Sequence, residues 1–462
     1  MPQETLSGAS GDQWGHKGAN GDTSQGERNG SQTAHWAKKV LKGKKKTVEG
    51  WKTESLGQVA QTTMGQSPDS KYYSEQENGL PFLQGCAEFG RSYPKNSLYC
   101  SQTKKIAKSG SILFSVRAPV GRINIANRDY IIGRGLAAIS GKEIEQQYLE
   151  HLLTFLEPKF HNASQGSTFE AINSSELIGW PIEFPTSKRE QAKIAEILST
   201  VDWAIEQTEA LIAKQQRIKT GLIQDLLTRG IDEHGNLRSE QTHKFKDSPL
   251  GRIPAEWAVL KVRDVFEIQL GKMLSPKASE GRSPFFYLGN KHVQWDHVEA
   301  SDLQMMDFDE RERYKYDLRL GDILVCEGGE VGRSAIWREE VQNCCYQKAI
   351  HRLRPINQKY LPSLFPRFMR WAIRRGILSD FTSQTSIAHL TQEKLAAVPV
   401  MVPNLPEQLR LTGILDQFDN DLSNQSDKLT KLNSLKNALM QDLLTGKKRV
   451  TAMLNEKEAD CA

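Results

Sequence analysis

The segment Gly221-Leu-Ile-Gln-Asp-Leu-Leu-Thr228 recurs as Ala438-Leu-Met-Gln-Asp-Leu-Leu-Thr445, and the residues from Gln to Thr are identical in the two copies. This match is the sharpest part of an internal repeat. Upstream, Gly110-Ser-Ile-Leu-Phe114 corresponds to Gly321-Asp-Ile-Leu-Val325. Self-similarity at a long period indicates that one structural unit is used more than once. We therefore expect two similar halves in a single chain.

Further matches fix the limits of each copy. Trp51 heads the first copy and Trp257 heads the second. Near the other end, the run from Pro181 to Pro185 that leads into Glu190-Gln191 corresponds to the run from Pro399 to Pro403 that leads into Glu407-Gln408. Each half therefore contains a mixed region, 51–187 or 257–404, followed by a long periodic segment, 188–229 or 405–446.

The long segments carry an apolar seam with alternating spacings of three and four residues, which is typical of a coiled-coil helix. The seam consists of Ile194, Leu198, Val201, Ile205, Ile212, Leu222 and Leu226 in the first copy and of Leu411, Leu415, Phe418, Leu422, Leu429, Leu432, Leu439 and Leu443 in the second. We expect the two helices to pair with each other. An antiparallel arrangement would keep Lys219 and Lys436, which occupy equivalent seam positions, apart. The alternative is two separate amphipathic helices, each lying on its own domain.

The mixed regions show short β-branched runs between Gly and Pro residues, which favours strands and turns. Helices are plausible near 147–156 and 361–377. The predicted fold class is α+β: two duplicated domains joined by two long antiparallel coiled-coil helices, with pseudo-two-fold symmetry. Residues 1–50 are rich in Gly, Ser, Gln and Asn and contain a Lys cluster, so we expect a disordered basic extension. Residues 230–256 are a predicted linker, and residues 447–462 a tail.

Composition limits the possible functions. The chain has 462 residues, with 61 Lys or Arg against 56 Asp or Glu, so net charge alone does not identify a partner. No apolar run is long enough for a bilayer span or a secretory signal, which predicts a cytoplasmic protein. The six cysteines form no Cys-x-x-Cys pair, so we expect reduced thiols and no zinc site.

Sequence motifs for catalysis are missing. There is no phosphate-binding Gly-rich loop with its Lys, no Asn-Pro-Pro-aromatic motif of amino-methyltransferases and no dinucleotide loop. Pro68-Asp69 with the distant Glu157-Pro-Lys159 is a loose match to a metal-nuclease pattern that the second half does not repeat. We predict no catalytic residues and no metal ligands in this chain.

The duplicated plan resembles the specificity subunit of type I restriction-modification enzymes over roughly residues 47–447. The resemblance rests on the repeat together with a set of local marks. These are Gly65-Gln-Ser-Pro68, Gly110-Ser-Ile-Leu-Phe114, Gly166-Ser-Thr-Phe169, the Pro181-to-Pro185 run into Glu190-Gln191, and Phe245-Lys-Asp-Ser-Pro-Leu-Gly-Arg-Ile-Pro254 before Trp257. The first fifty residues depart from the family pattern.

The resemblance implies a DNA-recognition protein without catalysis of its own. Each target-recognition domain would read one half of a bipartite site in double-stranded DNA, and helices spanning about 60 Å at about 1.5 Å per residue would set the spacing. It also implies partners: two methyltransferase subunits that use S-adenosylmethionine, and endonuclease subunits that translocate with ATP and Mg²⁺. Two alternatives stay open. One is a coiled-coil interaction or DNA-binding protein outside restriction, and the other is a divergent single-chain nuclease or methyltransferase.

Candidate DNA contacts are polar or basic residues beside predicted turns, because amide, hydroxyl and cationic groups reach base edges and phosphates. A solvated turn or a structural ion pair is the competing explanation for each of them. The candidates are Gln66, Ser67, Lys71, Tyr72, Tyr73, Arg117, Arg122, Arg134, Gln165 and Ser167 in the first domain, and Lys272, Lys291, Arg333, Lys348, Gln384 and Ser386 in the second. We expect Trp51 and Trp257 to be core residues.

Overall fold

The computed structural model describes residues 48–95, 98–164, 171–356, 359–381 and 389–454. The chain divides into two compact units. Unit 1 combines Met1–Ile205 with Lys431–Ala462, and unit 2 is Glu206–Thr430. Each unit contains one mixed domain and a part of each long helix. In the described ranges, no helix is both long and apolar enough to cross a bilayer.

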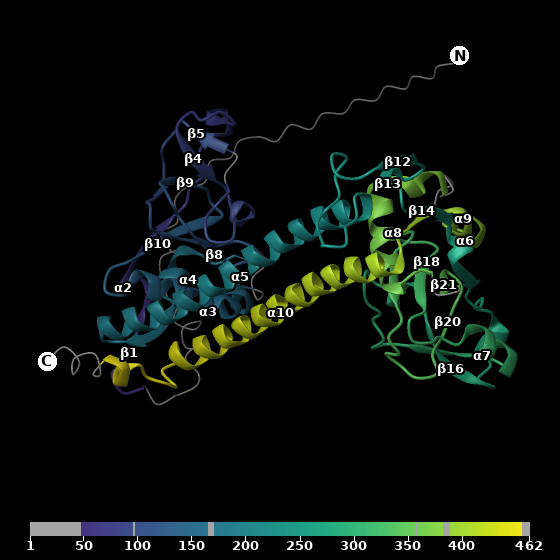
Figure 1. The fold of residues 1–462 in the computed structure, drawn as a ribbon. Helices are drawn as coiled ribbons and strands as arrows, with labels where there is room; N and C mark the ends of the chain where they lie inside the picture. Colours follow the sequence, from purple (N-terminus) through teal and green to yellow (C-terminus); the bar gives the residue numbers. More distant parts are fainter. Residues whose placement is uncertain (1–47, 96–97, 165–170, 357–358, 382–388, 455–462) are drawn as a thin grey trace, which may run out of the picture. The chain divides into compact units, whose positions relative to one another are not determined.

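In the described ranges, the mixed domain of unit 1 contains three sheets (Figure 1). One sheet pairs β1 (Trp51–Ser55) with β11 (Pro181–Pro185), so that the two ends of the domain lie together. The other two have the strand orders β2-β10-β7-β8 and β3-β5-β4-β9-β6. Their strands are β2 (Ala60–Met64), β3 (Tyr73–Ser74), β4 (Leu80–Leu83), β5 (Leu98–Cys100), β6 (Ile106–Ala107), β7 (Ile112–Ser115), β8 (Ile123–Ile125), β9 (Tyr130–Ile132) and β10 (Leu136–Gly141).

Helix α3 (Gln146–Ser164) closes the core of this domain, beside the shorter α2 (Leu56–Val59) and α4 (Ser174–Ile178). It is longer than the helix predicted near 147–156 and continues past Pro158. The fully buried ring of Phe160 lies beyond that proline, with its centroid 5.0 Å from Phe114 and 4.1 Å from Trp180. Aromatic burial of this kind offsets the backbone hydrogen bond that a proline removes.

The mixed domain of unit 2 has the same framework. The strand pair β14 (Ala258–Lys261) and β22 (Pro399–Val402) joins its two ends, and the four-stranded sheet has the order β15-β21-β18-β19. A three-stranded sheet, β17-β16-β20, and a hairpin, β12-β13, complete it. The remaining strands are β12 (Phe245–Ser248), β13 (Gly251–Pro254), β15 (Phe266–Leu270), β16 (Pro284–Leu288), β17 (Gln304–Asp307), β18 (Ile323–Cys326), β19 (Ser334–Ile336), β20 (Cys345–Tyr346) and β21 (Ile350–Pro355).

The helices of this domain are α6 (Val262–Val265), α7 (Glu310–Tyr316), α8 (Phe365–Arg374) and α9 (Gln392–Ala397). Helix α8 lies within the predicted helical range 361–377, and most of its residues are buried in the core. Trp51 and Trp257 are both buried, at 6% and 1% exposure. The mixture of strands and helices in two domains with matching sheets confirms the predicted duplicated α+β fold.

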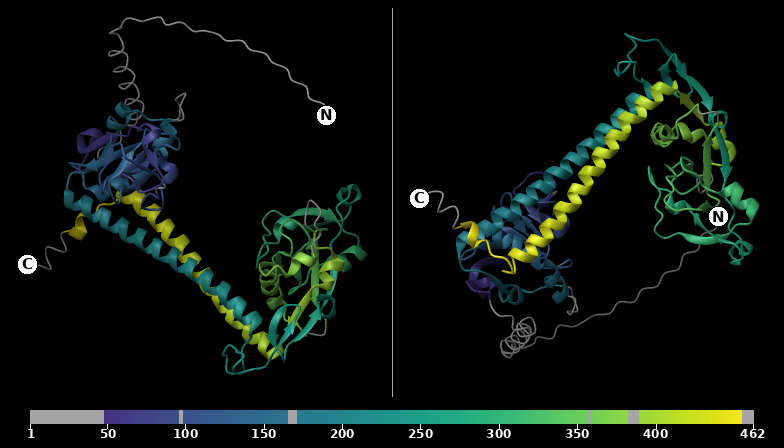
Figure 2. Two further views of the ribbon diagram at one scale, coloured as in Figure 1. Left: turned by 90° about the horizontal axis from the view of Figure 1, so that it is seen from above. Right: turned by 60° about the horizontal axis from the view of Figure 1, so that its bottom comes forward.

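The long helices are α5 (Lys188–Thr228) and α10 (Leu405–Leu443), and both units contain a stretch of each (Figure 2). In unit 1, Ile194 and Leu198 of α5 share one core with Met440 and Leu443 of α10. The first residues of α5 therefore meet the last residues of α10, so the pairing in this unit is antiparallel.

Unit 2 shows the same arrangement at the opposite ends of the helices. Leu226 and Leu227 of α5 share a core with Leu411 and Leu415 of α10. Every predicted seam residue in both helices is buried or half-buried, whereas neighbours such as Ser423 are exposed. This packing excludes the alternative of two helices that never meet.

A Glu-Gln pair ties the start of each long helix to its own mixed domain. The amide of Gln191 donates to the Pro185 carbonyl at 2.7 Å, and its oxygen accepts from the Glu145 backbone N–H at 2.8 Å. Gln408 does the same with the Pro403 carbonyl and the Leu361 N–H, both at 2.8 Å. Since the side chain satisfies backbone groups on two other elements, it fixes how the helix leaves the domain.

The preceding glutamates are completely buried, and each is bound by an arginine. Glu190 accepts from Nε and Nη2 of Arg449 at 2.6 and 2.7 Å. Glu407 is bound by Arg238, by the Trp257 indole N–H at 3.0 Å and by the Ile231 N–H at 3.0 Å. Arg238 lies in the segment predicted as a linker, so part of that segment belongs to the core of unit 2.

Candidate nucleic-acid interface

In the first domain, the loop after β2 lies directly against the turn between β9 and β10. A Cβ on Gly65 would be only 2.1 Å from the Gly133 carbonyl oxygen, so only glycine fits there. Ser67 then donates to the Gln84 side chain at 3.1 Å, and its hydroxyl accepts from the Arg134 backbone N–H at 3.2 Å. These contacts bring Gln66, Ser67 and Arg134 together, and the side chains of Gln66 and Arg134 are exposed.

The next three candidates, Lys71, Tyr72 and Tyr73, lie in one short turn and have different roles. Lys71 is exposed, 3.4 Å from Asp69 and 5.0 Å from the ring of Tyr72. Tyr73 packs on Phe82 and donates its hydroxyl to the Pro68 carbonyl at 3.0 Å. Burial raises the pKa of Tyr73. Its hydroxyl is already used, so Tyr73 supports the loop, while Lys71 remains available for an anion.

The three candidate arginines of the first domain are exposed, and within the described residues none of them has a carboxylate partner: Arg117, Arg122 and Arg134. Arg117 forms an isolated β-bridge with Ala171 through its backbone. Gln165 and Ser167 precede Ala171 but lie outside the described residues, as do Gln384 and Ser386 in the second domain. An arginine that is free of carboxylates can bind phosphate or guanine through its full set of donors.

The second domain has the same close glycine contact, but a charged residue, Lys272, follows the glycine where the first domain has the neutral Gln66. A Cβ on Gly271 would lie 2.2 Å from the Gln347 carbonyl oxygen. The next residue, Lys272, is only 15% exposed, and its Nζ donates to Glu312 and to the Asp307 carbonyl, both at 2.6 Å. Lys272 therefore holds α7 against the sheet and has little capacity left for DNA.

Lys348 is the exposed cation of this region. It corresponds to Arg134, because β21 follows it as β10 follows Arg134. Its backbone N–H donates to the Lys272 carbonyl at 2.6 Å, and Ala349 beside it has a φ of 85°. A non-glycine residue at positive φ is strained, and strain of this kind concentrates at binding sites.

The two remaining candidates are held by neighbouring acids. Lys291 is exposed but forms an ion pair with Asp302, and the hydrogen bond from Lys291 lowers the pKa of that carboxyl group. Arg333 is 15% exposed, and it donates to the Asn290 carbonyl at 2.9 Å and lies 3.5 Å from Glu330. Sequence reasoning missed Asn290, whose side chain also donates to the Gly328 carbonyl. Its position after Gly289 is the only signal in the sequence that points to a turn there.

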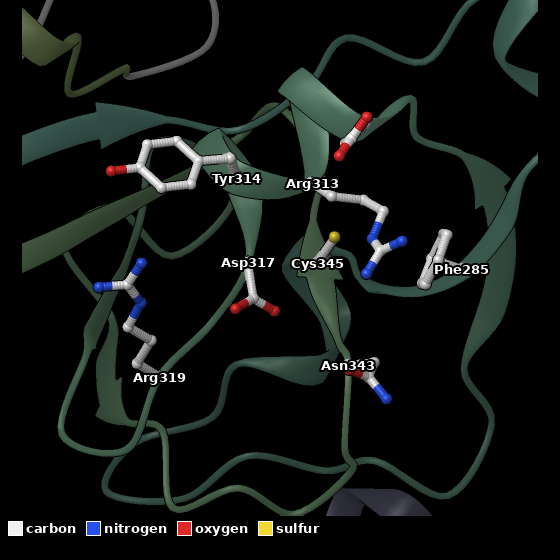
Figure 3. A pocket seen from close by; sticks show the side chains of 8 residues that line it. Phe285, Arg313, Tyr314, Asp317, Arg319, Asn343 and Cys345 are labelled. Atoms are coloured by element: carbon white, nitrogen blue, oxygen red, sulfur yellow. The ribbon is translucent and has the colours of Figure 1, made fainter.

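A cavity of about 300 Å³ lies in the second domain beside α7 (Figure 3). The guanidinium of Arg313 lies 4.5 Å from the centroid of the Phe285 ring. The lining carries both signs of charge: Phe285, Glu310, Arg313, Tyr314, Asp317, Arg319, Asn343 and Cys345. Burial raises the pKa of the Cys345 thiol to about 12, so this sulfur is a protonated wall atom and not a nucleophile.

The same holds for the neighbouring thiols, since burial raises the pKa of Cys326 to about 11 and that of Cys344 to about 12. All cysteines in the described part of the chain are free. Within those residues, no group of three or more His, Cys, Asp or Glu side chains is arranged to hold a metal ion. Among the described residues, the candidate binding features are therefore the exposed cations and polar loops of the two mixed domains.

Comparison with known proteins gives one family. Residues 48–215 and 254–434 match the model of the type I restriction modification DNA specificity domain. The putative type I restriction enzyme MjaX specificity subunit of Methanocaldococcus jannaschii is 38% identical over 184 residues, which are 39% of this chain and 43% of that protein. The MjaVIII specificity subunit of the same organism is 24% identical over 420 residues, covering 87% of this chain and 94% of that protein.

Solved structures share the fold. The S subunit of a type I restriction-modification system from M. genitalium superposes with a TM-score of 0.54 at 17% identity, covering 87% of this chain and 97% of that one. A chain from a study of complex assembly and conformational transition of the type I R-M system gives a TM-score of 0.56, also at 17% identity, covering 87% and 99%. At this identity the likeness concerns the fold alone.

Proposed function

Because this chain belongs to the family of type I restriction-modification DNA specificity domains, we propose that it is the subunit that selects the DNA target in such an enzyme complex. Each mixed domain reads one half of a bipartite site in double-stranded DNA. The observation that carries this proposal is the contrast between the two domains. Their glycine-dependent loops have the same backbone contacts, at Gly65 and Gly271, but the residue that follows differs: Gln66 is exposed, whereas Lys272 is held by Glu312.

Loops with a fixed backbone and variable side chains suit sequence readout. Phosphate contacts position a protein on the duplex, and contacts to base edges carry the specificity. In the first domain, Gln66 supplies amide groups for a base edge, while Lys71 and Arg134 supply positive charge. In the second domain, Lys348 lies at the position of Arg134. The two domains therefore favour two different half-sites.

The catalytic steps belong to other subunits in this proposal. Two methyltransferase subunits, which bind S-adenosylmethionine, dock on the α5–α10 pair, and endonuclease subunits supply ATP- and Mg²⁺-dependent translocation and cleavage. This chain itself needs no cofactor and works in the cytoplasm. Incubation of the pure chain with DNA, Mg²⁺ and S-adenosylmethionine is expected to give neither cleavage nor methyl transfer, and a robust activity of either kind would refute the assignment.

The decisive experiment exchanges one domain. Residues 51–187 are replaced with the matching region of a relative, and the methylated motif is determined genome-wide in cells that carry the parent chain, the chimera or neither. We expect one half of a bipartite motif to change while the other half and the spacer stay the same. A change in both halves, or in neither, contradicts independent reading by the two domains. A motif that persists without this chain contradicts the proposed function altogether.

A further inference from the structure

Two equivalent loops carry the sharpest difference between the domains. We call residues 116–122, between β7 and β8, the first hairpin loop. Its backbone is closed by the Ser115 N–H donating to the Arg122 carbonyl at 2.8 Å and by the Gly121 N–H donating to the Ser115 carbonyl at 3.0 Å. Gly121 has a φ of 96°, which a glycine adopts without strain.

The second hairpin loop, residues 327–333 between β18 and β19, is closed in the same way. The Cys326 N–H donates to the Arg333 carbonyl at 2.8 Å, and the Gly332 N–H donates to the Cys326 carbonyl at 3.0 Å. Gly332 has a φ of 80°. Equivalent hydrogen bonds thus close the two loops at their ends, and the residues between these bonds differ.

Those side chains differ in charge. The first hairpin loop carries Arg117 and Arg122 and no acidic residue, and both arginines are exposed. In the second hairpin loop, Gly328 replaces Arg117 and Glu330 replaces Pro119, so that Arg333 is the one remaining cation among the residues that correspond to 117–122. A loop with two guanidinium groups free of carboxylates attracts an anion, whereas the second hairpin loop carries two acidic residues, Glu327 and Glu330, against the single cation Arg333 and does not.

Arg333 is also fixed in place. One Nη donates to the Asn290 carbonyl at 2.9 Å, and the other lies 3.5 Å from Glu330. Glu330 in turn accepts from the Trp295 indole N–H, and Arg370 stacks on that indole ring at 4.8 Å. The side chain of Arg333 therefore connects the second hairpin loop to the Gly289–His292 turn instead of facing solvent.

The same asymmetry appears elsewhere in the second domain. Lys272 and Lys291 have carboxylate partners in Glu312 and Asp302, whereas Lys348 has none within the described residues. Among the candidate cations of the first domain, Arg117, Arg122 and Arg134 lack such a partner in the described part of the chain. Within the described residues, the first domain thus has three candidate cations without a carboxylate partner, and the second domain has one.

We propose that the two recognition domains hold DNA with unequal electrostatics. Arg117 and Arg122 of the first domain bind DNA phosphates, while Arg333 of the second domain is a positioning residue that fixes its loop and binds no phosphate. This inference rests on the proposed function and adds a division of labour to it. The first half-site is bound with a strong dependence on salt, and the second mainly through groups that do not release counterions.

The salt dependence of binding tests the proposal, because each phosphate contact contributes about 0.9 to the slope of log affinity against log salt concentration. The full chain with its methyltransferase subunits is titrated with a duplex that carries the methylated motif. The double variant Arg117→Gln/Arg122→Gln is expected to reduce the slope by about 1.8. The variant Arg333→Gln is expected to bind more weakly with an unchanged slope and to lose selectivity for the second half-site.

Glu330→Gln is the second variant, because it keeps the acceptor for Trp295 and removes the charge. Relief of repulsion from phosphate is expected to steepen the slope, which keeps the test valid if Arg333→Gln does not fold. Equal slope losses for the two loops, or an unchanged slope in the arginine double variant, would overturn this inference. If the parent complex binds motif and non-motif duplexes equally, the proposed function itself fails, so the two failures are distinguishable.

Discussion

The carboxylate of Asp202 on α5 lies 2.6 Å from the Nζ of Lys436 on α10. Unit 2 contains the same contact with the residue types exchanged between the helices, because Lys219 on α5 pairs with Asp419 on α10. The internal repeat aligns Asp202 with Asp419 and Lys219 with Lys436. The same two positions of the repeat thus form two ion pairs, and each seam lysine has a carboxylate partner on the opposite helix.

A double-mutant cycle measures this pair. Asp202→Asn and Lys436→Gln are each expected to destabilise unit 1, and together to show a coupling of about 1 kcal/mol, since residues in direct contact couple by roughly 0.5–3 kcal/mol. Urea unfolding of the four proteins gives the free energies. Combining Asp202→Asn with Lys428→Gln, an exposed residue of α10, serves as the control and should give additive effects.

Because Glu190 and Glu407, at the starts of the long helices, are buried, truncating their side chains is expected to lower the free energy of unfolding. Glu407→Ala would leave Arg238, 5% exposed, with the exposed Glu256 at 3.5 Å as its carboxylate partner, and breaking a buried ion pair in this way typically costs about 3–5 kcal/mol. Glu190→Ala is the matched variant in unit 1. Its partner Arg449 is 28% exposed and can reach water, so a smaller loss is expected. Thermal and urea unfolding compare the two, and equal losses would contradict the role of burial.

His351 predicts a pH dependence for unit 2. Its Nε2 donates to the Leu390 carbonyl at 2.8 Å, and its buried Nδ1 has no partner. Burial lowers the pKa of His351 below its usual value of about 6.5. The neutral ring is therefore favoured in the folded state, and its stabilisation is complete above pH of about 6.5 and is lost as the pH falls through the lower folded-state pKa.

The variant His351→Gln tests this dependence, because its amide can still donate to Leu390 but cannot titrate in this range. The free energy of unfolding is measured from pH 7.5 downward to about pH 5, the range in which histidines titrate. The parent chain is expected to lose more stability over this interval than His351→Gln. Parallel profiles would show that the imidazole does not carry the effect.

The seam predicts that the helix pair is the platform for the partner subunits. Leu422→Asp and Leu429→Asp each lose roughly 1.5–3 kcal/mol of apolar burial at most, and the carboxylate adds a desolvation cost. The pair should fray, and the methyltransferase should no longer co-purify. Ser423→Asp, at an exposed position between them, is the control and should assemble normally. Assembly of the Leu422→Asp/Leu429→Asp double variant would rule out this role for the seam.

The close approach of Gly65 and Gly271 to neighbouring carbonyl oxygens predicts that substitutions there affect separate halves of the motif. Gly65→Ala places a Cβ against the Gly133 carbonyl oxygen, and Gly271→Ala places one against the Gln347 carbonyl oxygen, so each loop must move. We expect each variant to weaken methylation through its own half of the motif. Gly221→Ala is the control, because a Cβ there meets nothing within 4 Å, and it should stabilise α5 by about 0.5–1 kcal/mol.

The sequence by itself determined the duplication, the α+β class and the seam. These properties rest on local periodicity and on comparison of the chain with itself. The identical run at Gln224–Thr228 and Gln441–Thr445 is visible in the sequence alone. The three- and four-residue spacing of the apolar seam residues is that of one face of a helix. The family resemblance followed from the same repeat. Even the pairing of the helices could be expected, since each seam alone leaves an apolar stripe exposed.

The tertiary structure alone decided which candidate side chains are bound by other groups of the protein and which are exposed. Lys272 is neutralised by Glu312, and Lys291 by Asp302, which follow them by 40 and 11 residues in the sequence. The hydroxyl of Tyr73 donates a hydrogen bond to the Pro68 carbonyl. Local sequence specifies the charge of a side chain, but its partners come from segments that the fold brings together. The sequence does not distinguish a lysine that has a carboxylate at 2.6 Å, such as Lys272, from a lysine that faces water. Only the three-dimensional contacts distinguish the two.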